Sequence, residues 1–153
     1  MKKWGPITWY FFHTLSFHIY GAKFNEEKYF IIKLLKDICS ILPCPYCKEH
    51  ANYYIKNNPV ENCNTQMDLI MYLFNFHNTV NLQTGKDAFN YDIFIKKYRS
   101  ANLGNILNEF IKEYRKSNQS SHGIMLSVNK NNIIDDMITH FKKNKNNYSW
   151  TAR

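Results

Sequence analysis

Leu42-Pro43-Cys44-Pro45-Tyr46-Cys47 is the most informative stretch of this chain. Pro43 favours the end of one helix, and Pro45 is tolerated in the first turn of the next. The N–H groups of a helix N-terminus stabilise a nearby thiolate, and two cysteines three positions apart can close a small disulfide ring. The pattern therefore predicts a redox centre that exchanges disulfides with another thiol.

Zinc binding is the main alternative for the same residues. Cys44, Cys47 and His50 are three plausible zinc ligands, and Cys39 or Cys63 could supply a fourth. Most small zinc modules carry a second Cys-x-x-Cys, and this chain has none. The cysteine spacing alone leaves three interpretations open, which are redox chemistry, zinc binding and purely structural cysteines.

Apolar periodicity on both sides of the cysteines predicts an all-α protein. We expect Gly21 to end the first helix and Asn25 to cap the second. The expected helices span residues 8–20, 25–41, 44–56, 65–81, 91–114 (with a break near Gly104) and 131–145. Residues 116–123 are polar and read as a linker. The prediction is a four-helix bundle with a short fifth helix and a C-terminal helical extension, divided into a domain at 1–115 and an extension at 116–153.

Composition narrows the class of protein further. The chain has 153 residues, 44% of them hydrophobic, a net charge of +8 and four cysteines. Its charge is spread along the sequence without a nucleic-acid-binding motif, and no span approaches the ~20 apolar residues of a membrane helix. The first residues do not resemble a signal peptide. We therefore expect a cytoplasmic protein that binds neither nucleic acid nor membrane.

Two further groups of residues have the composition of a binding site. Trp9, His13 and Phe17 are spaced by four and share one helix face. Residues 77–81 read His-Asn-Thr-Val-Asn and place polar amides on an otherwise apolar helix. Buried amides need partners, so a ligand could supply them. Ordinary core packing for the first group, and a helix end entering solvent for the second, are the alternatives.

In combination these motifs resemble the Erv/ALR family of FAD-linked sulfhydryl oxidases over residues 4–100. The matching elements are Gly5 and Trp9 followed by His13, the Pro-Cys-x-x-Cys at 43–47, the His-Asn-x-Val-Asn at 77–81, and then Lys86 and Tyr98. The resemblance implies FAD as cofactor, Cys44 and Cys47 as the catalytic pair, and no metal. It implies a cofactor site formed by Gly5, Thr8, Trp9, His13, Phe17, His77, Asn78, Val80, Asn81, Lys86 and Tyr98.

The resemblance also implies a reaction. A substrate thiolate attacks Cys44, Cys47 leaves and faces the flavin, and oxygen takes the electrons to give hydrogen peroxide. The short form looks most like members from large cytoplasmic DNA viruses, which implies a host-cytoplasm location and a place in the virion. Family members commonly form homodimers through their first helices, so we expect a homodimer. The expected electron donor is a small Cys-x-x-Cys protein.

This chain departs from the cellular members of the family in three places. Phe74 and Tyr91 stand where a structural disulfide joins two helices, so packing must replace that bond. Pro6 replaces an arginine, which puts one contact to FAD in doubt. No cysteine follows Cys63, so the C-terminal extension carries no shuttle pair. We expect Cys39 and Cys63 to be buried or free thiols, with a bond between them as the alternative.

Overall fold

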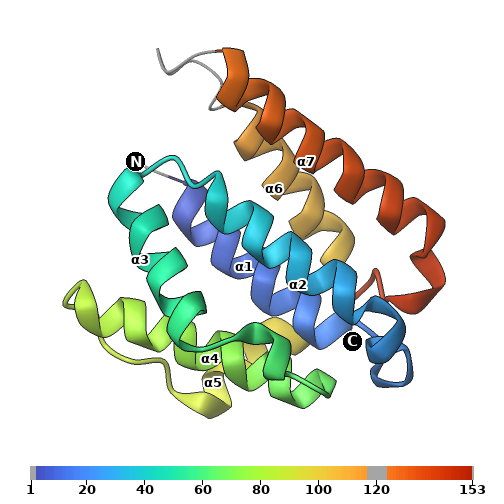
Figure 1. The fold of residues 1–153 in the computed structure, drawn as a ribbon. Helices are drawn as coiled ribbons and strands as arrows, with labels where there is room; N and C mark the ends of the chain where they lie inside the picture. The colour runs from blue at the N-terminus through green and yellow to red at the C-terminus, as the bar shows by residue number, and fades with distance from the viewer. Residues whose placement is uncertain (1–2, 117–123, 153) are drawn as a thin grey trace.

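The computed structural model describes residues 3–116 and 124–152, and within them it contains seven α-helices and no strand. The all-α prediction is therefore confirmed. The helices are α1 (Trp4–His18), α2 (Phe24–Ser40), α3 (Pro45–Asn57), α4 (Gln66–Gln83), α5 (Tyr91–Arg99), α6 (Leu103–Lys116) and α7 (Ile124–Lys143), as Figure 1 shows. Short 3₁₀ turns lie at Gly21–Lys23, Val60–Asn62 and Lys145–Asn147.

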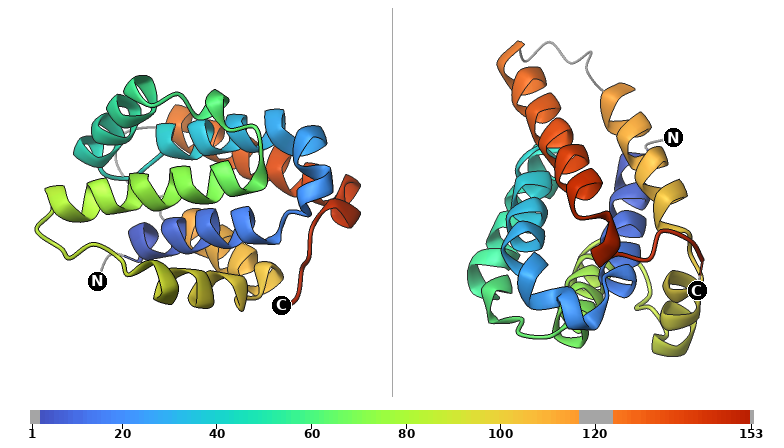
Figure 2. Two further views of the ribbon diagram at one scale, coloured as in Figure 1. Left: turned by 90° about the horizontal axis from the view of Figure 1, so that it is seen from below. Right: turned by 90° about the vertical axis from the view of Figure 1, so that its right-hand side faces the viewer.

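Helix α1 is at the centre of the molecule and packs against α4, α5 and α6. Helix α2 packs against α3 on one side and α7 on the other. The left view of Figure 2 shows α4, α1 and α5 running side by side, with α6 and α7 behind them. Nine of the fifteen residues of α1 are buried, which is expected for a helix with neighbours around most of its circumference.

Side-chain caps explain where α3 and α4 begin. Cys44 is the N-cap of α3, its sulfur accepts the N–H of Cys47 at 3.2 Å, and Pro45 follows in the first turn. Thr65 caps α4, and its side chain and that of Asp68 form a reciprocal capping box. These local signals explain why the predicted starts of both helices agree with the structure to within one residue.

The predicted C-terminal end of the first helix and the predicted N-cap of the second helix are wrong. Helix α1 ends at His18, because Ile19 is extended and forms a bridge with Tyr148. Gly21 instead begins the 3₁₀ turn that leads directly into α2, so Asn25 lies inside that helix and does not cap it. The chain ends α1 through a tertiary contact that local sequence does not reveal.

The predicted fifth helix is two helices, and the break lies at residues 100–102. The side chain of Asn102 accepts the N–H of Asn105 at 2.9 Å and so starts α6 as a new helix. Helix α7 begins at Ile124, seven residues before the predicted start at Asn131. The predicted linker lies almost wholly at 117–123, outside the described residues.

We call α6, α7 and residues 144–152 the C-terminal arm. The arm shares the main hydrophobic core with the bundle, because Phe110, Met137 and Phe141 are buried in the same cluster as Phe11 and Ile31. Helix α6 lies along α1 and α7 lies along α2. The domain boundary predicted at residue 115 stays a prediction. The residues before and after it share one hydrophobic core.

A buried carboxylate joins the arm to α2. Glu27 is 2% exposed and accepts hydrogen bonds from Tyr148 Oη, from Asn147 Nδ2 at 2.7 Å and from His140 Nε2 at 2.6 Å. The ring of His140 also stacks on Phe30 with a centroid distance of 3.5 Å. A buried carboxylate is stable only when its oxygens are satisfied, and here they have three donors. We call Glu27, His140, Asn147 and Tyr148 the Glu27 cluster.

Packing replaces the disulfide that this chain lacks between α4 and α5. The rings of Phe74 and Tyr91 meet edge to face with centroids 5.4 Å apart. Phe74 also contacts Phe94, and both belong to a second aromatic cluster that includes Phe17 and Tyr98. The expectation that packing fills this position is confirmed.

None of the helices in the described part of the chain has the length and apolar character needed to cross a membrane.

Candidate active site

A cavity of about 480 Å³ opens between the first half of α1, the start of α3, the last turns of α4, the loop that follows it, and α5. This volume lies in the range of small-molecule and cofactor sites. Most of its wall comes from aromatic and aliphatic side chains, and a small number of polar groups join them. A flat and largely apolar ligand with a few polar edges fits such a lining.

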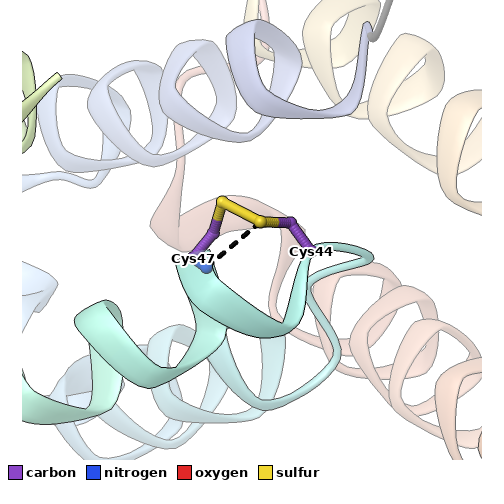
Figure 3. The surroundings of a disulfide bond; sticks show 2 residues. All are labelled: Cys44 and Cys47. Atoms are coloured by element: carbon purple, nitrogen blue, oxygen red, sulfur yellow. Dashed lines mark hydrogen bonds between the residues drawn. A yellow bond between two sulfur atoms is a disulfide. The ribbon is translucent and has the colours of Figure 1, made fainter.

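The redox pair lies at one wall of this cavity. Cys44 and Cys47 form a disulfide with their Cα atoms 5.2 Å apart at the first turn of α3, as Figure 3 shows. Cys47 lines the cavity, whereas Cys44 is not part of its wall. The hydrogen bond from the Cys47 N–H to the Cys44 sulfur shows that a helix N-terminus donates to this sulfur. The two cysteines therefore have different environments.

Stacked rings form a second wall. The indole of Trp9 lies parallel to the imidazole of His77, with centroids 4.2 Å apart and an angle of 3° between their planes. Phe76 meets the other edge of Trp9 at right angles. All three side chains line the cavity, and they come from α1 and α4.

Behind this wall His13 and His77 form a buried pair. Nε2 of His13 lies 2.8 Å from Nδ1 of His77. Burial lowers the pKa of both rings, and nearby positive charge lowers it further, to about 4 for His77. Both rings are therefore neutral at pH 7. When His13 donates in this hydrogen bond, the proton of neutral His77 is on Nε2.

The same pair contains a buried polar atom without a protein partner. Nδ1 of His13 is buried and makes no hydrogen bond, and Oγ1 of the neighbouring Thr14 is in the same condition. Most buried polar atoms in proteins are paired, so each exception calls for an explanation. An incomplete polar cluster beside a cavity is the arrangement expected where a ligand completes the network.

The loop after α4 folds back over the cavity. Gly85 has a φ of 75°, which favours glycine, and the N–H of Lys86 then bonds the carbonyl oxygen of Asn81 at 2.7 Å. Further along, the N–H of Phe89 bonds Oδ1 of Asn78 at 2.8 Å. These contacts bring Lys86 and Phe89 to the cavity wall.

The polar end of the cavity has a positive balance. Lys86 and Lys97 line it together with Asp87. The ammonium group of Lys97 lies over the rings of Tyr10 and Tyr98, at 5.1 and 5.2 Å from their centroids. An anionic group such as a phosphate would be favoured near two lysines and one aspartate.

The structure brings most of the predicted site residues together and leaves four away from the wall, which are Cys44, His13, Phe17 and Asn78. Those that line the cavity are Gly5, Thr8, Trp9, His77, Val80, Asn81, Lys86, Tyr98 and the catalytic candidate Cys47. His13 does not line the cavity itself and contacts the wall residues His77, Trp9 and Tyr98. Phe17 belongs to the second aromatic cluster, and Asn78 holds the loop at Phe89.

Several wall residues were absent from the sequence-based set. His50 lies three positions after Cys47 on the same helix and was considered only as a zinc ligand. Lys97 is adjacent to Tyr98, so its position on α5 offered a signal. Phe89 lies in a loop without periodicity, and no sequence signal could have found it.

The structure offers no support for a zinc site. Across residues 3–116 and 124–152, no three His, Cys, Asp or Glu side chains are grouped to hold a metal ion. Cys44 and Cys47 are bonded to each other, and Cys39 and Cys63 are buried free thiols. Burial raises the pKa of Cys39 to about 12, so this thiol stays protonated although it lines the cavity.

Comparisons with known proteins agree with this geometry. The model of the Erv1/Alr family matches residues 6–99. The FAD-linked sulfhydryl oxidase of African swine fever virus is 30% identical over 106 residues, which cover 69% of this chain and 88% of the relative. The 347L protein of Invertebrate iridescent virus 6, whose name proposes the same activity, is 29% identical over 107 residues, 63% of this chain and 92% of that relative. No solved structure matches the chain.

Proposed function

This chain belongs to the Erv1/Alr family, and we propose that it works as an FAD-linked sulfhydryl oxidase that makes disulfide bonds in partner proteins. The single observation that carries the proposal is the position of Cys47. Its sulfur is part of a reactive disulfide and of the wall of a large aromatic cavity. A redox pair that opens onto a cofactor-sized cavity can pass electrons to whatever the cavity holds.

The residues of the cavity fit FAD. Trp9, Phe89 and Tyr98 offer aromatic surfaces for flat rings. His77 and Asn81 provide polar groups for ring edges, and Lys86 and Lys97 provide charge for a diphosphate. Pro6, which stands where the family has an arginine, also lines the cavity. Lys97 lines the same cavity and can supply the positive charge that Pro6 lacks.

The chain's own chemistry is thiol–disulfide exchange at Cys44. A substrate thiolate attacks the sulfur of Cys44, a substrate–Cys44 bond forms, and Cys47 leaves as a thiolate facing the cavity. The second substrate thiolate then attacks the substrate sulfur of this mixed disulfide. The substrate disulfide forms and Cys44 leaves as a thiolate, which the N–H of Cys47 stabilises.

Bound FAD would supply a two-electron acceptor for the reduced cysteine pair and a route for those electrons to O₂, which with two protons gives hydrogen peroxide. Protein groups hold the cysteines and the wall in place for this step. Burial keeps Cys39 protonated, so it does not compete as a nucleophile beside Cys47. The electron donor that we propose is a dithiol protein, since the chain has no second pair of its own.

The visible absorption spectrum of the purified full-length protein tests the cofactor. We expect the absorption bands of oxidised flavin and about one FAD per chain. A colourless protein that carries stoichiometric zinc would instead support a zinc-stabilised interaction module and overturn the proposal.

Oxygen uptake with a dithiol tests the role of the cysteine pair. We expect Cys47→Ala to lose at least about a hundredfold in rate, because the route from Cys44 to the cavity is cut. Cys63→Ala is the matched control, since Cys63 is a buried free thiol away from the cavity. Equal rates for the two variants would contradict the role given to Cys47. The location in host cytoplasm or virion stays a prediction.

A further inference from the structure

The C-terminal arm reaches the wall of the cavity from outside the segment that matches the family. The hydroxyl groups of Thr8 and Tyr114 lie 2.6 Å apart. Thr8 is a cavity residue on α1, whereas Tyr114 is on α6, beyond the matched residues 6–99. Thr8 donates its own proton to the carbonyl oxygen of Trp4 at 2.6 Å. The Tyr114 hydroxyl is therefore the donor to Thr8.

This contact fixes the first turn of α1, which needs support. The N-cap residue Lys3 makes no side-chain hydrogen bond, so the helix start has no cap of its own. Trp4, Gly5 and Thr8 of this segment all line the cavity. Tyr114 thus holds the segment where α1 lacks a local capping side chain.

Packing holds Tyr114 itself in one position. Its side chain is 1% exposed, and its ring stacks on Phe110 with centroids 4.3 Å apart. Phe110 in turn packs on Phe11 of α1 at 4.7 Å. Burial raises the pKa of the Tyr114 hydroxyl, so it remains a donor at physiological pH.

The other end of the arm reaches a second wall residue. The ring of His18 lies between two carbonyl oxygens, with Nδ1 2.9 Å from that of Ser149 and Nε2 3.2 Å from that of Tyr98. Ser149 also donates its N–H to the carbonyl oxygen of His18 at 2.8 Å. Tyr98 is a cavity residue on α5. Through His18, the arm is therefore linked to the cavity wall at a second place.

We propose that helix α6 of the arm is a structural part of the cofactor site and that Tyr114 is a positioning residue for it. The Tyr114 hydroxyl holds Thr8, and through Thr8 the first turn of α1, in the place that cofactor binding requires. Tyr114 is not a catalytic residue, because it does not line the cavity. This inference rests on the proposed binding of FAD.

The test is FAD affinity, measured by titrating flavin-free full-length protein with FAD. Tyr114→Phe removes one buried donor, and we expect FAD to bind about threefold to tenfold more weakly. Tyr148→Phe is the matched control. It removes a buried arm hydroxyl that bonds Glu27, away from the cavity, and should leave FAD affinity within about twofold of the wild type.

Variants of Thr8 separate positioning from a general loss of stability. Thr8→Val removes the acceptor of the Tyr114 hydroxyl and should weaken FAD binding, and a Thr8→Val protein that binds FAD like the wild type would overturn the role of Tyr114. Adding Tyr114→Phe to Thr8→Val should weaken binding no further, because both changes break the same contact. Thr8→Val still decides the question if Tyr114→Phe does not fold.

Two results separate failure of this inference from failure of the proposed function. A wild-type protein that binds no FAD overturns the function. A wild-type protein that binds FAD, with unchanged affinity in Tyr114→Phe or an additive loss in the double variant, overturns the role of Tyr114 alone. Equal weakening in Tyr114→Phe and Tyr148→Phe would also overturn it.

Discussion

Two polar clusters differ in how completely their hydrogen bonds are satisfied. The Glu27 cluster joins α2 to the C-terminal arm, and the His13–His77 pair joins α1 to α4. Glu27 has three donors, all from the C-terminal arm. The His13–His77 pair has one internal hydrogen bond, and Nδ1 of His13 has no protein partner. The first cluster is closed, whereas the second adjoins the cavity.

This difference in hydrogen bonding distinguishes the polar residues that hold helices together from those that lie beside the cavity. A satisfied buried carboxylate fixes one arrangement of the helices around it, because any shift would leave a charge without partners. An incomplete cluster costs stability unless something else completes it. The Glu27 cluster therefore holds α7 and residues 147–148 against α2, and the histidine pair adjoins the cavity through His77.

The largest expected effect is on the stability of the arm. Glu27→Ala leaves the donors of Tyr148, Asn147 and His140 buried without an acceptor, so we expect the free energy of unfolding to fall by about 3 kcal/mol or more. Urea denaturation measures this change, and FAD affinity of the folded variant should be almost unaltered. A loss below about 1 kcal/mol would contradict the stabilising role of the Glu27 cluster.

The pH dependence of stability should come next in size. The folded-state pKa of His77 is about 4 against an ordinary value of 6.5, so the unfolded chain binds protons first as the pH falls. Stability is fully present above pH 6.5 and declines down to pH 4, by up to about 3 kcal/mol. His13 acts in the same direction. Urea midpoints of flavin-free protein at pH 7 and pH 5 measure the effect.

Glu27 adds to this decline at lower pH. Burial by itself raises the pKa of Glu27, but the hydrogen bonds from Tyr148, His140 and Asn147 outweigh it and the pKa is lowered. Its contribution is present above its ordinary pKa of 4.5 and is lost as the pH falls through the lower folded value. Stability that increased from pH 7 to pH 5 would contradict the assignment to His77, and stability that did not fall further below pH 4.5 would contradict the assignment to Glu27.

A smaller effect is expected when the histidine pair is replaced as a unit. The double variant His13→Phe/His77→Phe removes both partners of one hydrogen bond and keeps the ring volume, so stability at pH 7 should change by less than about 1 kcal/mol. FAD affinity should fall about tenfold, which separates the two properties. Thermal unfolding and FAD titration provide the two measurements. The decline in stability between pH 6.5 and 4 should also become flatter.

The smallest expected effect concerns the positive charge beside the pair. Burial is the main cause of the lowered pKa of His77, and Lys97 is the next. Lys97→Gln should therefore raise the pKa of His77 only in part, towards its ordinary value. Titration of the His77 ring by NMR measures the change. A pKa that did not move would show that burial alone keeps the ring neutral.

Local sequence signals accounted for the helices and for much of the cavity wall. Pro45, Thr65 and the apolar periodicity act within a few residues of the positions that they determine, so the starts of α3 and α4 were predictable. The motif residues Trp9 and His77 came from separate helices and do meet in space. The end of α1 was missed because Tyr148, more than a hundred residues away, determines it.

By itself, the sequence predicted an all-α fold, a redox-active cysteine pair at a helix start and the chemical character of its site. Those features depend on residue type and short spacing. Only the tertiary structure decided that Cys47 opens onto the cavity, that Asn78 holds a loop, and that Tyr114 reaches Thr8. The physical reason is that contacts between distant segments depend on how whole helices pack, and no local pattern specifies that arrangement.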